Sequence, residues 1–225
     1  MKKIVDYQSI LATCPLFAGA GEELMTMLGC LNGHLLEAKK GRYLLSEGDR
    51  VGEIGIVLEG AVQIVKEDYE GNRIILSQVR PGGLFAEAYA CAEVPYLPVS
   101  VLAAEDSVIL MADCQKVVNT CPRSCDHHKR MIANLMRGLA QKNVMLSEKH
   151  EIITRRTTRE KLMAYLMLEA GKQGAESFDI PYDRQALADY LGVDRSAMSQ
   201  ELGKMQREGL IRTRKNHFEL LEHKE

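Results

Sequence analysis

The sequence predicts an α+β fold built from three successive segments. The first is dominated by short β-branched runs divided by glycines, the second contains no proline and a single glycine, and the third has three helical patterns followed by a hairpin pattern. Such grouping of strands and helices along the chain is typical of the α+β class. We predict a β-rich domain, a long helix and a winged helix-turn-helix domain at residues 1–125, 126–153 and 154–225.

Length and composition favour a globular chain. With 225 residues, of which 46% are hydrophobic, the chain can bury sizeable cores. Its longest apolar runs fall far short of the roughly 20 residues that cross a bilayer. The N-terminal lysines meet Asp6 and Gln8 before an apolar signal segment can form. We therefore expect a cytoplasmic protein.

The first segment should form an antiparallel sandwich or a barrel-like roll. Residues 4–27 favour short helices around a break, and strand patterns follow with a turn signal about every 8–12 residues. The strand patterns cover residues 43–45, 54–58, 62–65, 74–76, 99–102 and 108–111. Residues 113–124 are expected to be a short polar join.

The long helix carries a candidate dimer seam. Its apolar positions alternate four and three residues apart, as in a coiled coil. The predicted dimer interface consists of Ile132, Met136, Leu139, Asn143 and Leu146. An alternative is a helix packed on its own domain, because the heptads are few and Met131 and Leu135 form a second apolar stripe.

Residues 183–205 predict two short helices about a tight turn. Asp183 and Asp194 are candidate N-caps, and Gly192 supplies the turn. The inward sides should be formed by Ala186, Leu187, Tyr190, Leu191, Met198, Leu202 and Met205. The outward side of the second helix carries Arg195, Ser196, Ser199, Gln200 and Lys204.

That outward side fits DNA recognition, because the second helix of a helix-turn-helix enters the major groove. Arginine can bind guanine and glutamine can bind adenine through paired hydrogen bonds. Lys204, with Arg212, Arg214 and Lys215 of the following hairpin, is better suited to phosphates. The alternative is an ordinary helical hairpin with a solvated charged face.

Four motifs together resemble the CRP/FNR superfamily of bacterial transcription regulators. KGRYLLSEGD at 40–49, GIVLEGAVQI at 55–64 and PGGLFAE at 81–87 resemble its cyclic-nucleotide-binding β-roll, a jelly-roll type of double-stranded β-helix. Residues 183–210 resemble its helix-turn-helix. The resemblance implies a homodimer on a palindromic operator, with RNA polymerase as a partner. Relatives often have glutamate and arginine where Ser196 and Gln200 stand, which implies a different half-site.

The sequence differs from the nucleotide-binding members of the superfamily at the residues that hold the phosphate. Glu87 is kept, but Ala86 replaces a glycine, and Leu97 and Pro98 replace an arginine and a serine. Because a buried phosphate needs a cation, we expect a small amphipathic or aromatic organic effector instead of cyclic AMP. A cyclic-nucleotide effector and a ligand-free core remain as alternatives. The predicted effector pocket comprises Phe85, Glu87, Tyr89, Leu97, Val99, Asn143, Leu146 and Ser147.

The cysteines suggest a different kind of sensor. Cys114, Cys121 and Cys125 precede His127 and His128, and such thiolates can hold an iron–sulfur cluster or respond to redox state. Iron–sulfur members of the superfamily carry an N-terminal cysteine cluster, however, whereas this chain has only Cys14 there. We therefore predict no metal or cofactor. No spacing of nucleophile, base and acid stands out, so an enzyme is not expected.

Overall fold

The computed structural model describes residues 3–67, 73–119 and 126–221 of the chain. The chain forms two compact units, Met1–Gln141 and Lys142–Glu225. Their boundary lies within the long helix α5 (Asp126–Ile153), which matches the helix predicted from the sequence. The predicted α+β class is confirmed, while the three sequence-based domain bounds stay predictions. No helix among the described residues is long and apolar enough to span a membrane.

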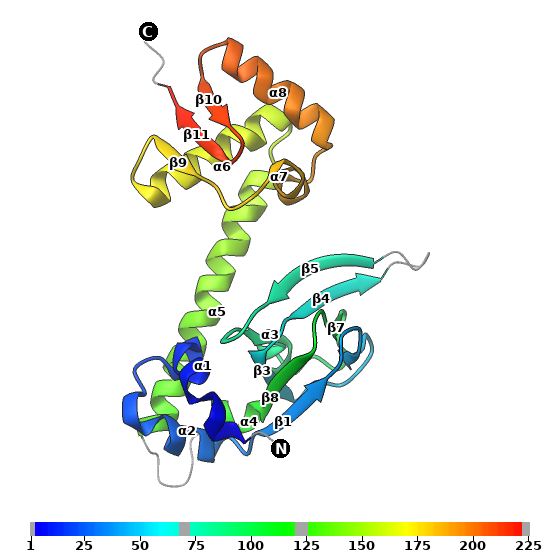
Figure 1. Ribbon diagram of the computed structural model, residues 1–225, viewed down its shortest axis with the longest axis vertical. Helices are drawn as coiled ribbons and strands as arrows, with labels where there is room; N and C mark the ends of the chain where they lie inside the picture. Colours follow the sequence, from blue (N-terminus) through cyan, green and yellow to red (C-terminus); the bar gives the residue numbers. More distant parts are fainter. Residues whose placement is uncertain (1–2, 68–72, 120–125, 222–225) are drawn as a thin grey trace. The chain divides into compact units, whose positions relative to one another are not determined.

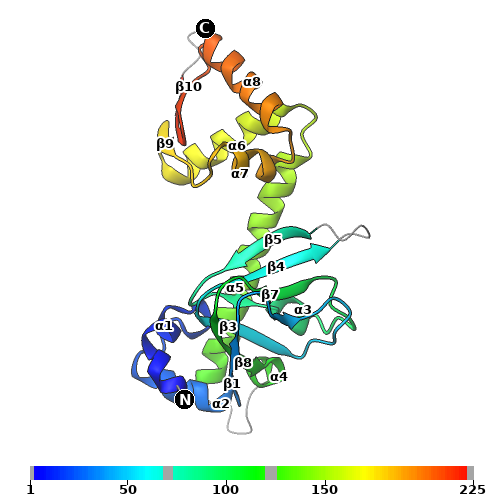
Figure 2. The same ribbon diagram turned by 45° about the vertical axis from the view of Figure 1, so that its right-hand side comes forward.

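Two four-stranded antiparallel sheets form the roll of the first unit. Their strand orders are β1-β8-β3-β6 and β2-β7-β4-β5. The strands are β1 (His34–Ala38), β2 (Tyr43–Leu45), β3 (Glu53–Glu59), β4 (Val62–Glu67), β5 (Arg73–Val79), β6 (Leu84–Phe85), β7 (Ser100–Ala103) and β8 (Ser107–Asp113). β4 and β5 make a hairpin at one edge of the second sheet (Figures 1 and 2). The predicted antiparallel roll is therefore present.

The space between the sheets is closely filled. Val57, Val62, Val101 and Ile109 contribute to one buried cluster there, together with Phe85 of β6. A Cβ atom at Gly55 on β3 would lie 2.0 Å from the Phe85 ring, well inside van der Waals contact. Glycine at position 55 thus allows the aromatic ring to pack directly against the backbone of β3.

The first unit also contains several short helices. They are η1 (Ile4–Tyr7), α1 (Gln8–Thr13), η2 (Pro15–Phe17), η3 (Gly21–Glu23), α2 (Leu24–Cys30), α3 (Glu87–Cys91) and α4 (Cys114–Val118). Buried Asn134 of α5 donates hydrogen bonds to the carbonyls of Leu16 (3.1 Å) and Ala18 (2.9 Å). Arg130 likewise donates to the Gly19 carbonyl at 2.7 Å. These bonds satisfy carbonyls of the N-terminal segment and hold it against the start of α5.

The second unit is a winged helix-turn-helix, as predicted. It contains α6 (Thr158–Gln173), β9 (Ser177–Asp179), α7 (Arg184–Leu191), α8 (Arg195–Arg207), β10 (Ile211–Arg214) and β11 (His217–Leu220). The antiparallel sheet has the order β10-β11-β9, and α6 and α8 pack beside it (Figure 1). The core includes Tyr165, Leu166, Leu187, Met198 and Phe218.

The prediction of a polar join at residues 113–124 was wrong in part. Residues 114–118 form the short helix α4, whose N-cap Asp113 accepts a hydrogen bond from the Gln115 amide. Buried Cys114 and Val117 attach α4 to the core of the first unit. A single turn of helix is decided by such local capping and packing, which periodicity over five residues does not reveal.

Candidate nucleic-acid interface

The turn between α7 and α8 is fixed by local interactions. The Asp183 carboxylate accepts from the Ala186 amide at 2.8 Å, and the Asp194 carboxylate accepts from the Ala197 amide at 2.9 Å. Both predicted N-caps are therefore confirmed. Between the helices Gly192 adopts a left-handed φ of 61°, which a glycine tolerates without strain. The geometry of the motif thus follows from three residues that the sequence analysis identified.

One side of each helix is anchored in the core of the second unit. Leu187 and Leu191 of α7 are buried, and so are Met198, Leu202 and Met205 of α8. Ala186 and Tyr190, also predicted to face inward, are half-buried. The orientation of α8 about its own axis is consequently set by the core, which leaves the opposite side to solvent.

The polar side chains on the exposed side of α8 differ in whether they are hydrogen-bonded within the protein. All five predicted residues, Arg195, Ser196, Ser199, Gln200 and Lys204, are exposed. The Ser196 hydroxyl donates to Asp194, and the Ser199 hydroxyl donates to the Arg195 carbonyl at 2.9 Å. Among the described residues, by contrast, the Arg195 and Gln200 side chains have no hydrogen-bonding or ionic partner. These two side chains are available for an external ligand.

Some predicted phosphate ligands are engaged in surface ion pairs. Lys204 lies 3.5 Å from Glu201, and Arg212 lies 3.3 Å from Glu219. The Lys204 and Arg212 side chains are 57% and 72% exposed. Exposed ion pairs contribute little to stability, so a phosphate can replace these carboxylates at small cost.

The wing is formed by β10 and β11 with Lys215 and Asn216 between them. Lys215 has a left-handed φ of 56°, and Arg214 and Lys215 are exposed. The Asn216 side chain donates to the Ile180 carbonyl at 3.2 Å, while the Asn216 carbonyl accepts from the Ile180 amide at 2.9 Å. These bonds fix the position of the wing turn within the second unit.

A hollow of about 580 Å³ connects the wing with the starts of α7 and α8. It is lined by Pro181, Tyr182, Asp183, Arg184, Gln185, Arg195, Lys215 and Asn216. Arg195 and Lys215, predicted separately, are thereby brought to one place. Arg184, Gln185 and Asn216 were not identified from the sequence, although a cation directly after the Asp183 cap was a possible signal.

Two contacts hold the Arg184 side chain at this hollow. Its Nη2 donates to the Thr213 hydroxyl at 2.8 Å, and its guanidinium lies 5.0 Å from the centroid of the Phe218 ring. Burial lowers the pKa of Arg184 from its usual value. Its Nη1 is buried and has no hydrogen-bond partner in the described part of the chain. An anion in the hollow would compensate this partly desolvated cation.

The predicted effector residues fall into two groups. Phe85, Glu87, Leu97 and Val99 are buried in the first unit, and Tyr89 is half-buried there. Asn143, Leu146 and Ser147 are exposed on the portion of α5 that belongs to the second unit. Ala86 directly before α3 has a left-handed φ of 63°, the conformation that a glycine would favour.

The segment around Leu97 and Pro98, where the family's phosphate-binding residues would lie, is hydrogen-bonded to other residues of the first unit. The Leu97 amide donates to the Asp49 carbonyl (2.8 Å), and the Leu97 carbonyl accepts from the Gly48 amide (2.9 Å). Lys66 reaches this segment, but its ammonium contacts the Glu47 carboxylate at 2.5 Å and the Pro98 carbonyl at 2.8 Å. The Leu97 backbone groups and the Lys66 ammonium therefore already have hydrogen-bond partners within the protein.

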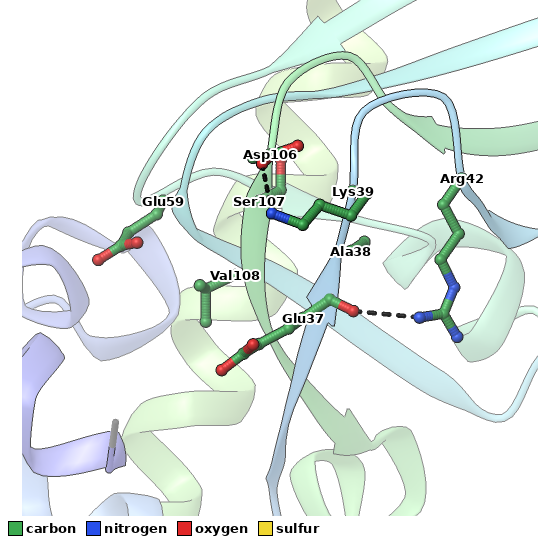
Figure 3. Close-up of a pocket in the computed structure, with 8 residues that line it drawn as sticks. All are labelled: Glu37, Ala38, Lys39, Arg42, Glu59, Asp106, Ser107 and Val108. Carbon is green, nitrogen blue, oxygen red and sulfur yellow. Dashed lines mark hydrogen bonds and ion pairs between the residues drawn. The ribbon is translucent and has the colours of Figure 1, made fainter. Parts of the chain in front are cut away.

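A second hollow, of about 540 Å³, lies on the roll (Figure 3). It is lined by Glu37, Ala38, Lys39, Arg42, Glu59, Asp106, Ser107 and Val108, and contains none of the predicted effector residues. Lys39 binds Asp106 at 2.7 Å, and Arg42 donates to the Glu37 carbonyl at 3.2 Å. The hydrogen bond from Lys39 holds the pKa of Asp106 below its usual value. This hollow therefore has no excess of cationic groups for a phosphate.

The cysteine cluster is only partly described. Cys114 is buried, whereas Cys121 and Cys125 lie outside the described residues. His127 lies 3.4 Å from Glu23, and His128 is buried. Within residues 3–67, 73–119 and 126–221, no three histidine, cysteine or acidic side chains are grouped as metal ligands would be. The iron–sulfur alternative stays untested.

Two domain families match the two units. Residues 35–124 match the cyclic nucleotide-binding domain, and residues 160–225 match the Crp-like helix-turn-helix domain. Together the matches follow the order in which the roll and the winged helix-turn-helix occur along the chain. The first match lies on the roll and the second includes the α7–α8 motif.

Similar proteins include both regulators and a channel. The nitrogen fixation regulation protein FixK of Bradyrhizobium diazoefficiens is 24% identical over 189 residues, which are 80% of this chain and 74% of FixK. The potassium channel KOR2 of Oryza sativa is 24% identical over 132 residues, which are 59% of this chain and only 18% of the channel. The c-di-GMP responsive regulator CLP of Xanthomonas campestris has the same fold, with a TM-score of 0.57 at 16% identity over 88% of this chain and 99% of CLP.

Proposed function

The chain belongs to the CRP/FNR family of transcription regulators, and from this we propose that it binds an operator with two-fold symmetry as a homodimer. Each subunit would place the N-terminal part of α8 in the major groove of one half-site. We expect it to act in the bacterial cytoplasm, with RNA polymerase as a partner.

The observation that carries this proposal is the pair of unengaged side chains on α8. Arg195 can donate two hydrogen bonds to guanine, and Gln200 can bind the edge of adenine. Ser196 and Ser199 are tied to Asp194 and to the Arg195 carbonyl, which leaves them a smaller part in reading bases. Arg195 and Gln200 are therefore the proposed specificity residues.

The remaining cations are suited to the DNA backbone. Lys215 and Arg184 line the same hollow as Arg195, so a phosphate there would lie beside the base-reading helix. Arg214 is exposed at the end of β10, and Lys204 and Arg212 can exchange their carboxylate partners for phosphates. Such contacts position a protein on DNA without selecting a sequence.

Exposed apolar residues on α5 support the homodimer. Met136, Val144, Met145 and Leu146 are each more than half exposed, and Ile153 is 37% exposed. An uninterrupted helix with so many exposed apolar side chains is typical of a surface that pairs with another chain. Met136 and Leu146 belong to the predicted seam, and Ile153 continues its spacing. Within the seam Asn143 takes an a position that can fix the register. We propose that two α5 helices pair along this seam.

We further propose a small organic effector instead of a cyclic nucleotide. Leu97, which the resemblance aligns with the phosphate-binding arginine, is a buried apolar residue, and Lys66 is already paired with Glu47, which supports an effector without a phosphate. Effector binding would shift the population of dimers whose recognition helices match the half-site spacing. Calorimetric titration with cyclic AMP and cyclic GMP tests this point, because micromolar binding of either nucleotide would contradict it.

The DNA-binding proposal is tested with sites selected from random DNA, with and without cell extract. Arg195→Ala should lose roughly 1–3 kcal/mol of discrimination at one base position, whereas Lys215→Ala should weaken binding to all sequences alike. Lys40→Ala, which removes an exposed cation from the first unit, is the matched control and should leave both properties unchanged. Equal losses of specific and nonspecific binding in both α8 and wing variants would refute the assigned roles.

A further inference from the structure

Two thiols of the first unit are in contact. Cys91 is the last residue of α3, Cys114 is the first residue of α4, and their Sγ atoms lie 3.4 Å apart. Gln115 of α4 also donates a hydrogen bond from Nε2 to Oε1 of Glu93, two residues after the end of α3 (3.2 Å). A disulfide needs an S–S distance of about 2.05 Å, so the two sulfurs must approach by only roughly 1.4 Å.

We propose that Cys91 and Cys114 are a modification site, and that a peroxide converts them into a reversible intramolecular disulfide. The bond would fix the C-terminal end of α3 to the N-terminal end of α4. Because α3 also carries Glu87 and Tyr89, oxidation would restrain a helix that contributes two residues to the predicted effector pocket. The proposal is independent of DNA binding.

The two thiols differ in accessibility, which sets the order of reaction. Cys91 is half-buried, whereas Cys114 is only 1% exposed. Burial, followed by the hydrogen bond with Cys91, raises the pKa of Cys114 to about 12, so Cys114 is a thiol at neutral pH. A peroxide arriving from solvent therefore meets Cys91 first.

Peroxide is the sole oxidant in both steps of the reaction. The Cys91 sulfur attacks one peroxide oxygen, an S–O bond forms as the O–O bond breaks, and the thiol proton leaves with the other oxygen as water. The Cys114 sulfur then attacks the Cys91 sulfenic acid, an S–S bond forms as the S–O bond breaks, and a second water leaves with the Cys114 proton. The two thiols lose two electrons and the peroxide gains them.

Other cysteines serve as internal comparisons. Cys14 is fully buried, and burial raises its pKa to about 11, so it should stay reduced. Cys121 and Cys125 are close to Cys114 in sequence and are the competing partners to distinguish. Cleavage after lysine, arginine and glutamate separates Cys91 (residues 88–93), Cys114 (106–116), Cys121 (117–123) and Cys125 (124–129) into different fragments.

The test is mass mapping of the full-length protein after hydrogen peroxide and thiol blocking. We expect fragment 88–93 to be linked to fragment 106–116 in the oxidised wild type. The linked product should be absent from untreated protein, from oxidised Cys91→Ser and from oxidised Cys114→Ser, and dithiothreitol should remove it. Cys30→Ser, at another half-buried cysteine, should keep the linked product. Absence of the link in the oxidised wild type, or linkage of 106–116 to 117–123 or 124–129 instead, would overturn the proposal.

Dimedone labelling tests whether Cys91 reacts with peroxide before Cys114. Without its partner, Cys91 in Cys114→Ser should accumulate as a sulfenic acid that dimedone labels on fragment 88–93. Cys91→Ser should show no dimedone label on fragment 106–116, because Cys114 is buried and protonated. Strong labelling of Cys114 in that variant would show that the buried thiol reacts first, contrary to the mechanism.

Discussion

Replacing Leu146 by glutamate is expected to split the proposed homodimer. Leu146 is 65% exposed on α5, and the a/d spacing places it in the seam with Met136 and Asn143. In a dimer the leucine would be buried against its symmetry mate, so the glutamate would bring a carboxylate into an apolar contact in each subunit.

The expected effect follows from the exposed area. Full burial of a leucine side chain contributes about 1.5–3 kcal/mol, so burying the 65% that is exposed would contribute about 1–2 kcal/mol in each chain. Two-fold symmetry doubles the loss, and the dimer dissociation constant should rise by roughly 30- to 700-fold. Desolvation of two carboxylates adds to this loss.

Sedimentation velocity over a dilution series measures the dissociation constant directly. Gln141→Glu is the matched control, because it adds the same charge to an exposed position of α5 that lies opposite the a/d seam. The control should remain as dimeric as the wild type. If Leu146→Glu dimerises as tightly as Gln141→Glu, or if the wild type is monomeric at micromolar concentration, the proposed pairing of α5 helices is wrong.

Three further variants test the packing and the caps. Gly55→Ala should destabilise the roll by about 1–3 kcal/mol in urea unfolding, because its Cβ would meet the Phe85 ring at 2.0 Å, whereas Gly52→Ala, with open space around its Cβ, should be neutral. Tyr165→Phe should unfold with an unchanged free energy or one up to about 1 kcal/mol larger, because the buried hydroxyl has no partner among the described residues, and a clear loss would reveal a hidden hydrogen bond. The Ser196 hydroxyl and then the Ala197 amide lower the pKa of Asp194, so its contribution to stability is present above the ordinary carboxyl pKa and is lost as the pH falls through the lowered value. Between about pH 5 and pH 2 the wild type should therefore lose more stability than Asp194→Asn, and parallel pH profiles would contradict this assignment.

Elements of the fold could be predicted where the local sequence carries a clear pattern. The 28-residue helix α5 could be predicted because only one glycine interrupts it, and the α7–α8 motif because two caps flank a turn glycine. The two-residue strand β6 and the five-residue helix α3 were not identified. Such short elements depend on tertiary packing, such as the contact of Phe85 with Gly55, which no local pattern contains.

The candidate site likewise combines residues that could be predicted from the sequence with residues that could not. Exposure of Arg195 and Gln200 follows from helical spacing and could be predicted, but the role of Arg184 could not. Arg184 lies in the hollow only because Thr213 and Phe218, far along the chain, hold its guanidinium. The contact between Cys91 and Cys114, 23 residues apart, likewise depends on how α3 and α4 pack. Sequence spacing alone pointed to Cys121 and Cys125 as partners instead.

Selection of bound sites from random duplex DNA shows directly whether α8 recognises a specific operator. The wild type, with or without cell extract, should enrich a sequence with two-fold symmetry whose half-site centres lie about 10 base pairs apart, or a multiple of that spacing. Arg195→Ala should enrich sites that have lost the preference at one base pair in each half-site. Enrichment of no sequence under either condition, or of a motif that Arg195→Ala and Gln200→Ala leave unchanged, would contradict recognition by α8.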